Sequence, residues 1–326
     1  MNHAPTAPPA RIAITGSSGL YGRALLREIR RELPAARVLG IDRRAAAADL
    51  PDEFFGGDLL DPAATAALVA FRPDTLVHLA FAVEPGRDRA AMRRTHVEGT
   101  RGLLAAAATV PAARVLLASS ATVYGAWPDN PVACRESDPL RPRPEYYYSA
   151  DKGLVEQVVA EFAAAHPAIA VAVTRPVIVC GPGARNFITD FFLHAPCMLL
   201  PDGADTPLQF VHEADLARAT LTLVRAAARG PFNVAPDDVL TQREIAAELG
   251  IAAIPLPHRL LTIVGRAWWH LRLPFFRTPP GLSHYIRHRW VVSSERLRRE
   301  LGFEFSHSSR QAFRTLLESD RSPDGR

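Results

Sequence analysis

The chain of 326 residues is poor in cysteine and holds no long basic block. Its three cysteines, Cys134, Cys180 and Cys197, are too few for a disulfide framework and do not follow a metal-ligand spacing. The net charge is only +4, and no run of basic residues is long enough to track a nucleic acid. These scarcities argue against a disulfide-stapled secreted module, a metal site and a nucleic-acid partner, and they favour the cytoplasm.

The sequence also lacks a stretch of about 18 uncharged apolar residues, so it predicts no membrane span. The most apolar late stretch, residues 260–276, is interrupted by Arg266, His270 and Arg272. We expect it to form a buried or interface helix; contact with a membrane surface is the alternative. Residues 1–10 lack a charged head followed by an apolar run, so we expect a short disordered leader rather than a signal peptide.

Lysine is almost absent: Lys152 is the only lysine, and the other 37 of the 38 basic residues are arginine. A chain so biased towards arginine keeps lysine chiefly where a planar guanidinium cannot replace a compact ammonium. Lys152 also lies four residues after Tyr148. This single lysine therefore marks a candidate catalytic position.

Short apolar runs alternate with alanine-rich helical stretches through the first half of the chain. The predicted strands are residues 11–15, 37–41, 75–80, 114–118 and 169–174. The predicted helices lie near residues 20–33, 61–71, 88–108 and 146–166. This alternation predicts an α/β fold with a Rossmann-type, doubly wound parallel sheet. We assign residues 11–180 to an NAD(P)-binding Rossmann domain, and residues 181–326 to a smaller, mostly helical substrate-binding region that can return segments to the sheet.

A glycine-rich loop follows the first predicted strand and opens the first predicted helix. Its glycines, Gly16, Gly19 and Gly22, follow the pattern G-x-x-G-x-x-G. The first permits a sharp turn, the second lets the backbone approach a pyrophosphate, and the third lets the helix pack closely on the strand. Free N–H groups at the helix start favour the phosphates. The loop predicts a dinucleotide site, with Ser18 and Leu20 among its contacts.

We expect this dinucleotide to be NAD, with NADP as the alternative. Asp42 ends the second strand, where a carboxylate bonds the ribose hydroxyls and repels a 2′-phosphate. Arg43 and Arg44 favour the opposite choice if they bind that phosphate, and neither choice if they are only solvated. Asp58 is a candidate partner for the adenine amino group, whereas Asp61 is better placed to cap the next helix.

A candidate proton-transfer pair opens the helix near residues 146–166. Tyr148 and Lys152, at i and i+4, lie on one face of it. A phenol with a pKa of about 10 is a poor base at neutral pH, but a neighbouring ammonium lowers that pKa and makes it a usable general acid/base. Ser119 and Ser120 end the fifth strand, where open α/β sheets place their ligands, and a hydroxyl there can hold a substrate oxygen against the tyrosine.

The order of the motifs resembles the NAD-dependent epimerase/dehydratase group of the extended short-chain dehydrogenases. Over about residues 11–250 the motifs are TGSSGLYG, GDLLD, VHLA, HVEGTRGLL, LLASSATVYG, YSADK, TRPVIVCGPG and FVHEADLARA. The resemblance implies that Ser120, Tyr148 and Lys152 are catalytic. Tyr148 and Lys152 are also candidates for cofactor contact, since the ammonium can donate to the nicotinamide ribose; further candidates are Leu59, Leu79, Ala80, Phe81, Pro176 and Val179. Candidates for substrate contact are Ser120, Thr122 and Asn186.

Three departures from that family's pattern bear on the substrate. His96 stands where the family usually has asparagine, and we expect a structural role for it. The segment SSATVYG lacks the Asp-Glu pair of sugar-nucleotide dehydratases, and residues 207–210 replace an arginine-bearing stretch that grips a nucleotide pyrophosphate. The aromatic residues of the 254–290 stretch suit a less polar substrate, or core and dimer packing equally well; they include Trp268, Trp269, Phe275, Phe276 and Trp290.

The sequence thus predicts an NAD(P)-dependent enzyme that moves a hydride at a secondary alcohol or ketone, with Tyr148 as general acid/base. A sugar-nucleotide epimerase is one interpretation, and a dehydrogenase of an apolar, 3β-hydroxysteroid-like alcohol is the alternative. A non-catalytic NAD(P)-sensing regulator is disfavoured because such a protein is expected to lose the Tyr–Lys pair. The expected partners are a small-molecule substrate and a second copy, in a homodimer through helices 88–108 and 146–166 as the family implies.

Overall fold

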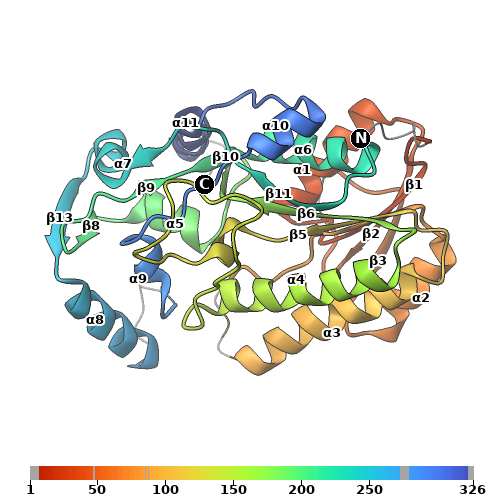
Figure 1. The fold of residues 1–326 in the computed structure, drawn as a ribbon, viewed down its shortest axis with the longest axis horizontal. Helices are drawn as coiled ribbons and strands as arrows, with labels where there is room; N and C mark the ends of the chain where they lie inside the picture. Colours follow the sequence, from red (N-terminus) through yellow and green to blue (C-terminus); the bar gives the residue numbers. More distant parts are fainter. Residues whose placement is uncertain (1–6, 47, 85, 87, 272–278, 322–326) are drawn as a thin grey trace.

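The computed structural model describes residues 7–46, 48–84, 86, 88–271 and 279–321. A seven-stranded parallel sheet forms the centre of the protein, in the order β11-β6-β5-β4-β1-β2-β3 (Figure 1). Its strands are β1 (Arg11–Thr15), β2 (Arg37–Asp42), β3 (Glu53–Gly56), β4 (Thr75–His78), β5 (Arg114–Ala118), β6 (Ala170–Pro176) and β11 (Gly230–Val234). Strands β1 to β3 are added in one direction from β1, and β4, β5, β6 and β11 are added in the other. The order of the strands therefore reverses between β1 and β4, which confirms the predicted doubly wound fold.

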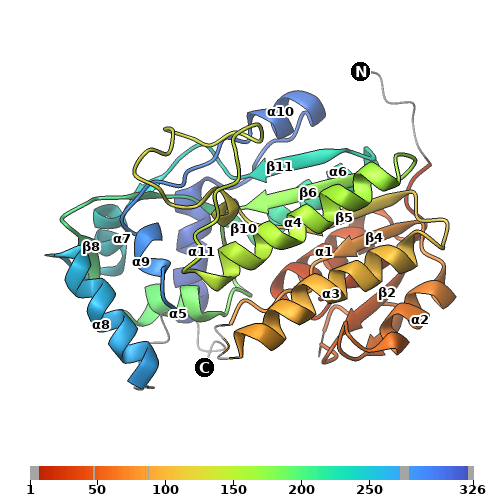
Figure 2. The same ribbon diagram turned by 60° about the horizontal axis from the view of Figure 1, so that its bottom comes forward.

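Helices cover both faces of this sheet, as Figure 2 shows. One face carries α1 (Leu20–Glu32) and α6 (Glu213–Arg225), and the other carries α2 (Pro62–Phe71), α3 (Arg89–Ala107) and α4 (Tyr147–Ala165). Alternate strand residues supply the two cores: Ile12 and Ile14 face the first set of helices and Ala13 faces the second. Strands buried on both faces explain why the sequence reads as continuous apolar runs.

The chain after residue 180 builds a smaller region beside the carboxyl ends of the strands, and returns α6 and β11 to the sheet. Short strand pairs join β7 (Ile178–Cys180) to β10 (Phe210–His212), β8 (Cys197–Pro201) to β13 (Ala252–Leu256), and β9 (Pro207–Leu208) to β12 (Leu240–Thr241). The helices are α5 (Phe187–His194), α7 (Gln242–Leu249), α8 (His258–Leu271), α9 (Leu282–Tyr285), α10 (Glu295–Leu301) and α11 (Ser309–Arg321). Arg272, Phe275 and Phe276 of the sequence analysis, and residues 1–6 of the expected leader, lie outside the described residues.

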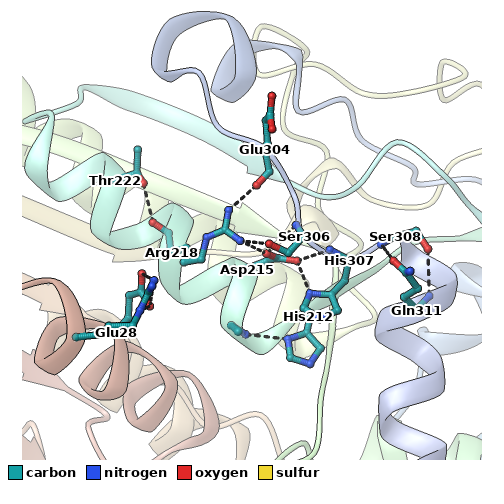
Figure 3. Close-up of polar contacts among 12 residues, drawn as sticks. Glu28, His212, Asp215, Arg218, Thr222, Glu304, Ser306, His307, Ser308 and Gln311 are labelled. Atoms are coloured by element: carbon teal, nitrogen blue, oxygen red, sulfur yellow. Dashed lines mark hydrogen bonds and ion pairs between the residues drawn. The ribbon is translucent and has the colours of Figure 1, made fainter.

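A buried carboxylate fastens the C-terminal segment to α6 (Figure 3). Asp215 is fully buried and accepts hydrogen bonds from Ser306 N, His307 N and His307 Nδ1 at 2.9–3.0 Å, and from Arg218 at 2.8 Å. The His307 ring stacks on His212 at 4.0 Å, and burial lowers the pKa of His212 to about 4. This cluster gives His212, Asp215 and Arg218 of the motif FVHEADLARA structural contacts.

Within the described residues, no helix is both long and apolar enough to cross a membrane. The same part of the chain brings no three His, Cys, Asp or Glu side chains together as metal ligands.

Candidate active site

The glycine loop sits at the point where the order of the strands reverses. Gly16 has a φ of +71°, and a Cβ on it would lie 2.7 Å from the backbone nitrogen of Ala80, in the loop after β4. A Cβ on Gly22 would lie 2.3 Å from the Gly16 oxygen. Leu79 N and Ala80 N in turn bond Thr15 at the end of β1, at 3.0 and 3.3 Å. Glycine is therefore required at Gly16 for the loops after β1 and β4 to meet, and at Gly22 for α1 to begin against the turn that precedes it.

The start of α1 fits a dinucleotide pyrophosphate. The N-cap residue is Gly19, so no capping side chain occupies the N–H groups of the first turn. That turn also holds no acidic residue. A Cβ on Gly19 would meet one atom of the described residues, the Gly16 oxygen at 3.4 Å. Open space over free N–H groups is what an anion needs at a helix N-terminus. Leu20 begins this helix and approaches Gly183, so the loop after β7 borders the same place.

Asp42 stands at the end of β2, as expected, and is half-buried. Its Oδ2 accepts a hydrogen bond from Ser18 N at 3.0 Å, which ties the glycine loop to β2. Arg43 and Arg44 are exposed beside it. The carboxylate thus faces the glycine loop, and the two arginine side chains lie in solvent beside it. This arrangement is compatible with the expected ribose contact.

Asp58 follows β3 and accepts from Leu60 N at 3.0 Å. The helix-capping role falls to Asp61, which accepts from Ala63 N at the start of α2, so that prediction is confirmed. Leu59 lies against Gly99 of α3, Pro176 ends β6 and Val179 lies in β7. Asp58 and Leu59 thus follow the edge strand β3, whereas Pro176 ends a strand two places from β4 and Val179 lies in a separate two-stranded sheet.

The structure brings Ser120, Tyr148 and Lys152 together beyond the end of β5. Ser120 lies close enough to the Tyr148 side chain to oppose the rise of its pKa, and Ser120 Oγ accepts from Thr122 N at 3.2 Å and Thr122 Oγ1 at 3.0 Å. Lys152 Nζ donates to Ala118 O at 2.5 Å and lies 5.7 Å from the centre of the Tyr148 ring. The predicted serine, tyrosine and lysine thus form one cluster at the carboxyl edge of the sheet.

Burial controls the protonation of this cluster. It raises the pKa of Tyr148 to about 12, with the Ser120 hydrogen bond opposing the rise. It lowers the pKa of Lys152 to about 7, with the charge of Glu156 opposing the fall. The expected net lowering of the Tyr148 pKa is therefore not found in this structure, because desolvation of the phenolate is the largest cause. At neutral pH Tyr148 carries its proton and is ready to donate it.

A buried ion pair behind the lysine escaped the sequence analysis. Glu156, one turn after Lys152, pairs with Arg175 of β6 at 2.7 Å, and both side chains are 6% exposed. Ser119 donates to Glu156, and Arg175 donates to Tyr124 at 2.7 Å. Ser119 therefore belongs to this network and Ser120 alone to the site. The available signals were an arginine ending an apolar strand and a glutamate at i+4 from the only lysine.

His96 holds the loop after β4 in place. Its Nε2 accepts from Ala82 N at 3.1 Å, so its Nδ1 carries the hydrogen and donates to Asp151 at 3.1 Å. The His96 ring stacks on the Phe81 ring, with 3.6 Å between the ring centres. Lys152 Nζ lies 3.7 Å from the centre of the same Phe81 ring. The contacts give His96 the structural role that was expected and make Phe81 a wall of the lysine site.

A cavity of about 870 Å³ opens beside the cluster. Thr122 and Tyr146 are among the residues that line it, and Tyr146 lies 5.9 Å from Tyr148, ring centre to ring centre. Its other walls come mainly from α5, α8 and α9 and are largely apolar, including Ile178, Phe187, Phe191, Leu199, Leu208, Leu261, Val264, Trp268, Leu282, Ile286 and Trp290. Glu84 and Asp190 are the acidic lining residues, and no arginine or lysine of the described chain is among those that line it.

Two sequence positions tied to the substrate are used elsewhere. Asn186 caps α5 by accepting from Ile188 N and Thr189 N at 2.9 and 3.2 Å, and it is not among the described residues that line the cavity. Gln209, in the 207–210 stretch, is buried and bonds the backbone of Val292 and Pro236. Neither residue offers a positive charge to a substrate. Of the three predicted substrate contacts, Thr122 does lie in the cavity wall.

Comparisons with known proteins agree with this geometry. The profile of the NAD dependent epimerase/dehydratase family matches residues 12–235. An uncharacterized protein of Mycobacterium tuberculosis is 27% identical over 318 residues, covering 94% of this chain and 82% of its own. The dTDP-6-deoxy-L-talose 4-dehydrogenase (NAD(P)(+)) of Kitasatospora kifunensis is 35% identical over 146 residues, covering 44% of this chain and 45% of its own.

Solved structures share the fold. MoeE5 in complex with UDP-glucuronic acid and NAD is 23% identical with a TM-score of 0.75, covering 96% of this chain and 99% of its own. DesIV, a dTDP-glucose 4,6-dehydratase from Streptomyces venezuelae with NAD and TYD bound, is 21% identical with a TM-score of 0.74, covering 97% and 98%. Since the family profile spans well over half of the chain and the glycine loop fits a dinucleotide, the protein is an NAD-dependent enzyme of the epimerase/dehydratase family.

Proposed function

We propose that the protein moves a hydride between NAD and the carbon of a secondary alcohol or ketone, with Tyr148 as general acid/base. The observation that carries this proposal is the Ser120–Tyr148–Lys152 cluster, which lies between the glycine loop's edge of the sheet and the cavity. Gly16, Ser18, Gly19, Leu20 and Asp42 would hold the dinucleotide. A non-catalytic sensor does not need this cluster, so we disfavour that alternative.

Each residue of the cluster has a role in proton transfer. In the reductive direction Tyr148 Oη gives its proton to the substrate oxygen while Ser120 Oγ holds that oxygen by a hydrogen bond. The Lys152 ammonium then stabilises the phenolate that remains. When bound as NADH, the cofactor supplies the hydride that adds to the carbonyl carbon, so that the ketone gains one hydride and one proton and leaves as the alcohol.

We infer an uncharged, largely apolar substrate. A nucleotide diphosphate needs cations, and the described cavity walls offer two carboxylates and no arginine or lysine. An apolar alcohol of steroid-like size fits such walls. The second candidate is a nucleotide sugar, processed by a dehydrogenase or an epimerase, which the names of the talose dehydrogenase and of MoeE5 favour.

We further propose NAD rather than NADP, a homodimer and a cytoplasmic location. The Asp42 carboxylate beside Ser18 supports NAD, because it repels a 2′-phosphate. The adjacent long helices α3 and α4 support a two-fold interface through that face (Figure 2), testable by sedimentation velocity. The free cysteines Cys134, Cys180 and Cys197 support a reducing compartment.

The test is Tyr148→Phe, assayed with NADH and NAD⁺ on a panel of apolar secondary alcohols and ketones and of nucleotide sugars. Turnover is expected to fall by about 10²–10⁴-fold while NAD affinity stays within about twofold. Tyr147→Phe is the control, because its hydroxyl bonds Val83 O at 2.8 Å and not Ser120. Unchanged turnover in Tyr148→Phe, or NAD binding with no turnover of any panel member, contradicts the proposal.

A further inference from the structure

Helix α8 presents an apolar face to the outside. Leu260, Ile263, Val264 and Leu271 are 48%, 66%, 48% and 69% exposed, and Ala267 between them is exposed as well. Their spacing of i, i+3, i+4, i+7 and i+11 places all five on one stripe of the helix. Single exposed apolar residues are ordinary, but a continuous stripe of four large ones marks a contact surface.

The charged residues of α8 and of the sequence around it are basic, and Asp202 accepts a hydrogen bond from His258 N at the start of the helix. Arg259 and Arg266 are exposed and lie seven residues apart, along one flank of the stripe. In the sequence, residues 249–294 hold six arginines and four histidines, with no aspartate or glutamate among their 46 residues. A basic, aromatic-rich and acid-free segment around an amphipathic helix is typical of proteins that bind anionic lipid surfaces.

The neighbouring side of α8 belongs to the cavity. Leu261, Gly265 and Trp268 line the cavity, and Val264 both lines it and is exposed. The helix lies at the end of the molecule farthest from α2 and β3, as Figures 1 and 2 agree. One helix therefore carries the exposed stripe on one side and part of the cavity wall on the neighbouring side.

We propose that α8 docks the protein on an anionic lipid surface. The stripe Leu260–Leu271 enters the boundary between headgroups and acyl chains, and Arg259 and Arg266 bind lipid phosphates. The alternative, a second copy seated on the same stripe, would bring the acid-free segments of two chains against each other, because a two-fold interface pairs a patch with itself. Like charges disfavour that contact and favour the lipid.

The experiment is co-sedimentation of the full chain with vesicles of phosphatidylcholine alone and of phosphatidylcholine mixed with phosphatidylglycerol. Binding is expected only to the mixed vesicles, and it should weaken as salt is added. Ile263→Asp, and separately the pair Arg259→Glu with Arg266→Glu, should each reduce the bound fraction about tenfold at low salt. The control pair is Val132→Asp with Arg299→Glu, which changes a 76% exposed valine and an exposed arginine away from α8.

Thermal unfolding and NADH binding of each variant show whether it is folded. The proposal is overturned if the parent protein binds neither vesicle, if it binds both equally, or if folded Ile263→Asp binds as well as the parent. It is also overturned if sedimentation shows a parent dimer that Ile263→Asp converts to a monomer while no vesicle binds. None of these readouts depends on finding a substrate, so they leave the proposed hydride transfer to its own test.

Discussion

Apolar side chains are buried at one end of this molecule and exposed at the other. At the sheet, Ile12 and Ile14 are 1% and 0% exposed, whereas on α8 Leu260 and Ile263 are 48% and 66% exposed. Apolar residues of the first kind make the fold, since burial is what stabilises them. Those of the second kind gain nothing from folding, which is why we assign them to a partner. The same residue type thus reports stability in one region and function in the other.

The largest expected effect would test how far the sheet region depends on its buried polar network. Glu156→Ala leaves the Arg175 guanidinium buried without its carboxylate, which should lower the free energy of unfolding by about 3–5 kcal/mol. The control Glu98→Ala breaks the exposed pair with Arg101 and should cost under about 1 kcal/mol. Urea unfolding of both variants measures the difference. Equal losses would show that the network does not support α4.

The second prediction concerns the pH dependence of the site between the two regions. The Lys152 pKa is lowered to about 7, so its ammonium is present below that pH and is lost as the pH rises. The kcat/KM for ketone reduction should therefore fall above about pH 7, approaching tenfold per pH unit. In Lys152→Arg the charge persists, so activity should be lower but free of this descending limb. A limb that survives in Lys152→Arg would assign it to another group.

The third prediction separates backbone strain from cofactor contact. Gly16→Ala places a side chain at a φ of +71° and against Ala80 N, and the conformation alone should cost about 1–2 kcal/mol. NAD affinity, measured by calorimetry, should fall about tenfold or more, because the loop must shift. Gly250→Ala is the matched control: it has a φ of +70° at the end of α7 with no described atom within 4 Å. That variant should lose similar stability and keep its NAD affinity.

The smallest expected effect sharpens the contrast with α8. Ile263→Ser should change the free energy of unfolding by no more than about 0.5 kcal/mol, because the side chain is mostly solvated already. Ile12→Ser in the core should cost several kcal/mol by the same measurement. A large loss in Ile263→Ser would mean that the stripe packs within the protein and would remove the reason for a lipid partner.

The sheet and the glycine loop were predictable because their signals are local. Buried parallel strands must be continuous apolar runs, and the loop needs glycine at Gly16 and Gly22 for reasons of space. The pairing of Tyr148 with Lys152 followed from helical spacing alone. The motif order added Ser120, which the structure places against Tyr148.

Other features depend on contacts between distant segments, and the sequence could not reveal them. The Glu156–Arg175 pair joins α4 to β6, and the cavity collects walls from residues 84 to 290. The pKa of Tyr148 depends on how deeply that ring is buried, which no spacing rule reports. Asn186 was expected to bind the substrate, but it caps α5 instead. Asparagine is a favourable N-cap residue, so its presence in the sequence does not distinguish the two roles.

The return of α6 and β11 to the sheet has a consequence for recombining this enzyme with its relatives. β11 forms the edge of the seven-stranded sheet beside β6, and α6 packs against α1, although both follow the cavity-forming segment α5–β10 along the chain. A chimera joined once, after Cys180, would take its edge strand and one covering helix from a foreign parent. To exchange the cavity-forming segments, a chimera would instead keep Glu213–Val234 from the same parent as residues 11–180. Only the segments before and after Glu213–Val234 would then come from the other parent.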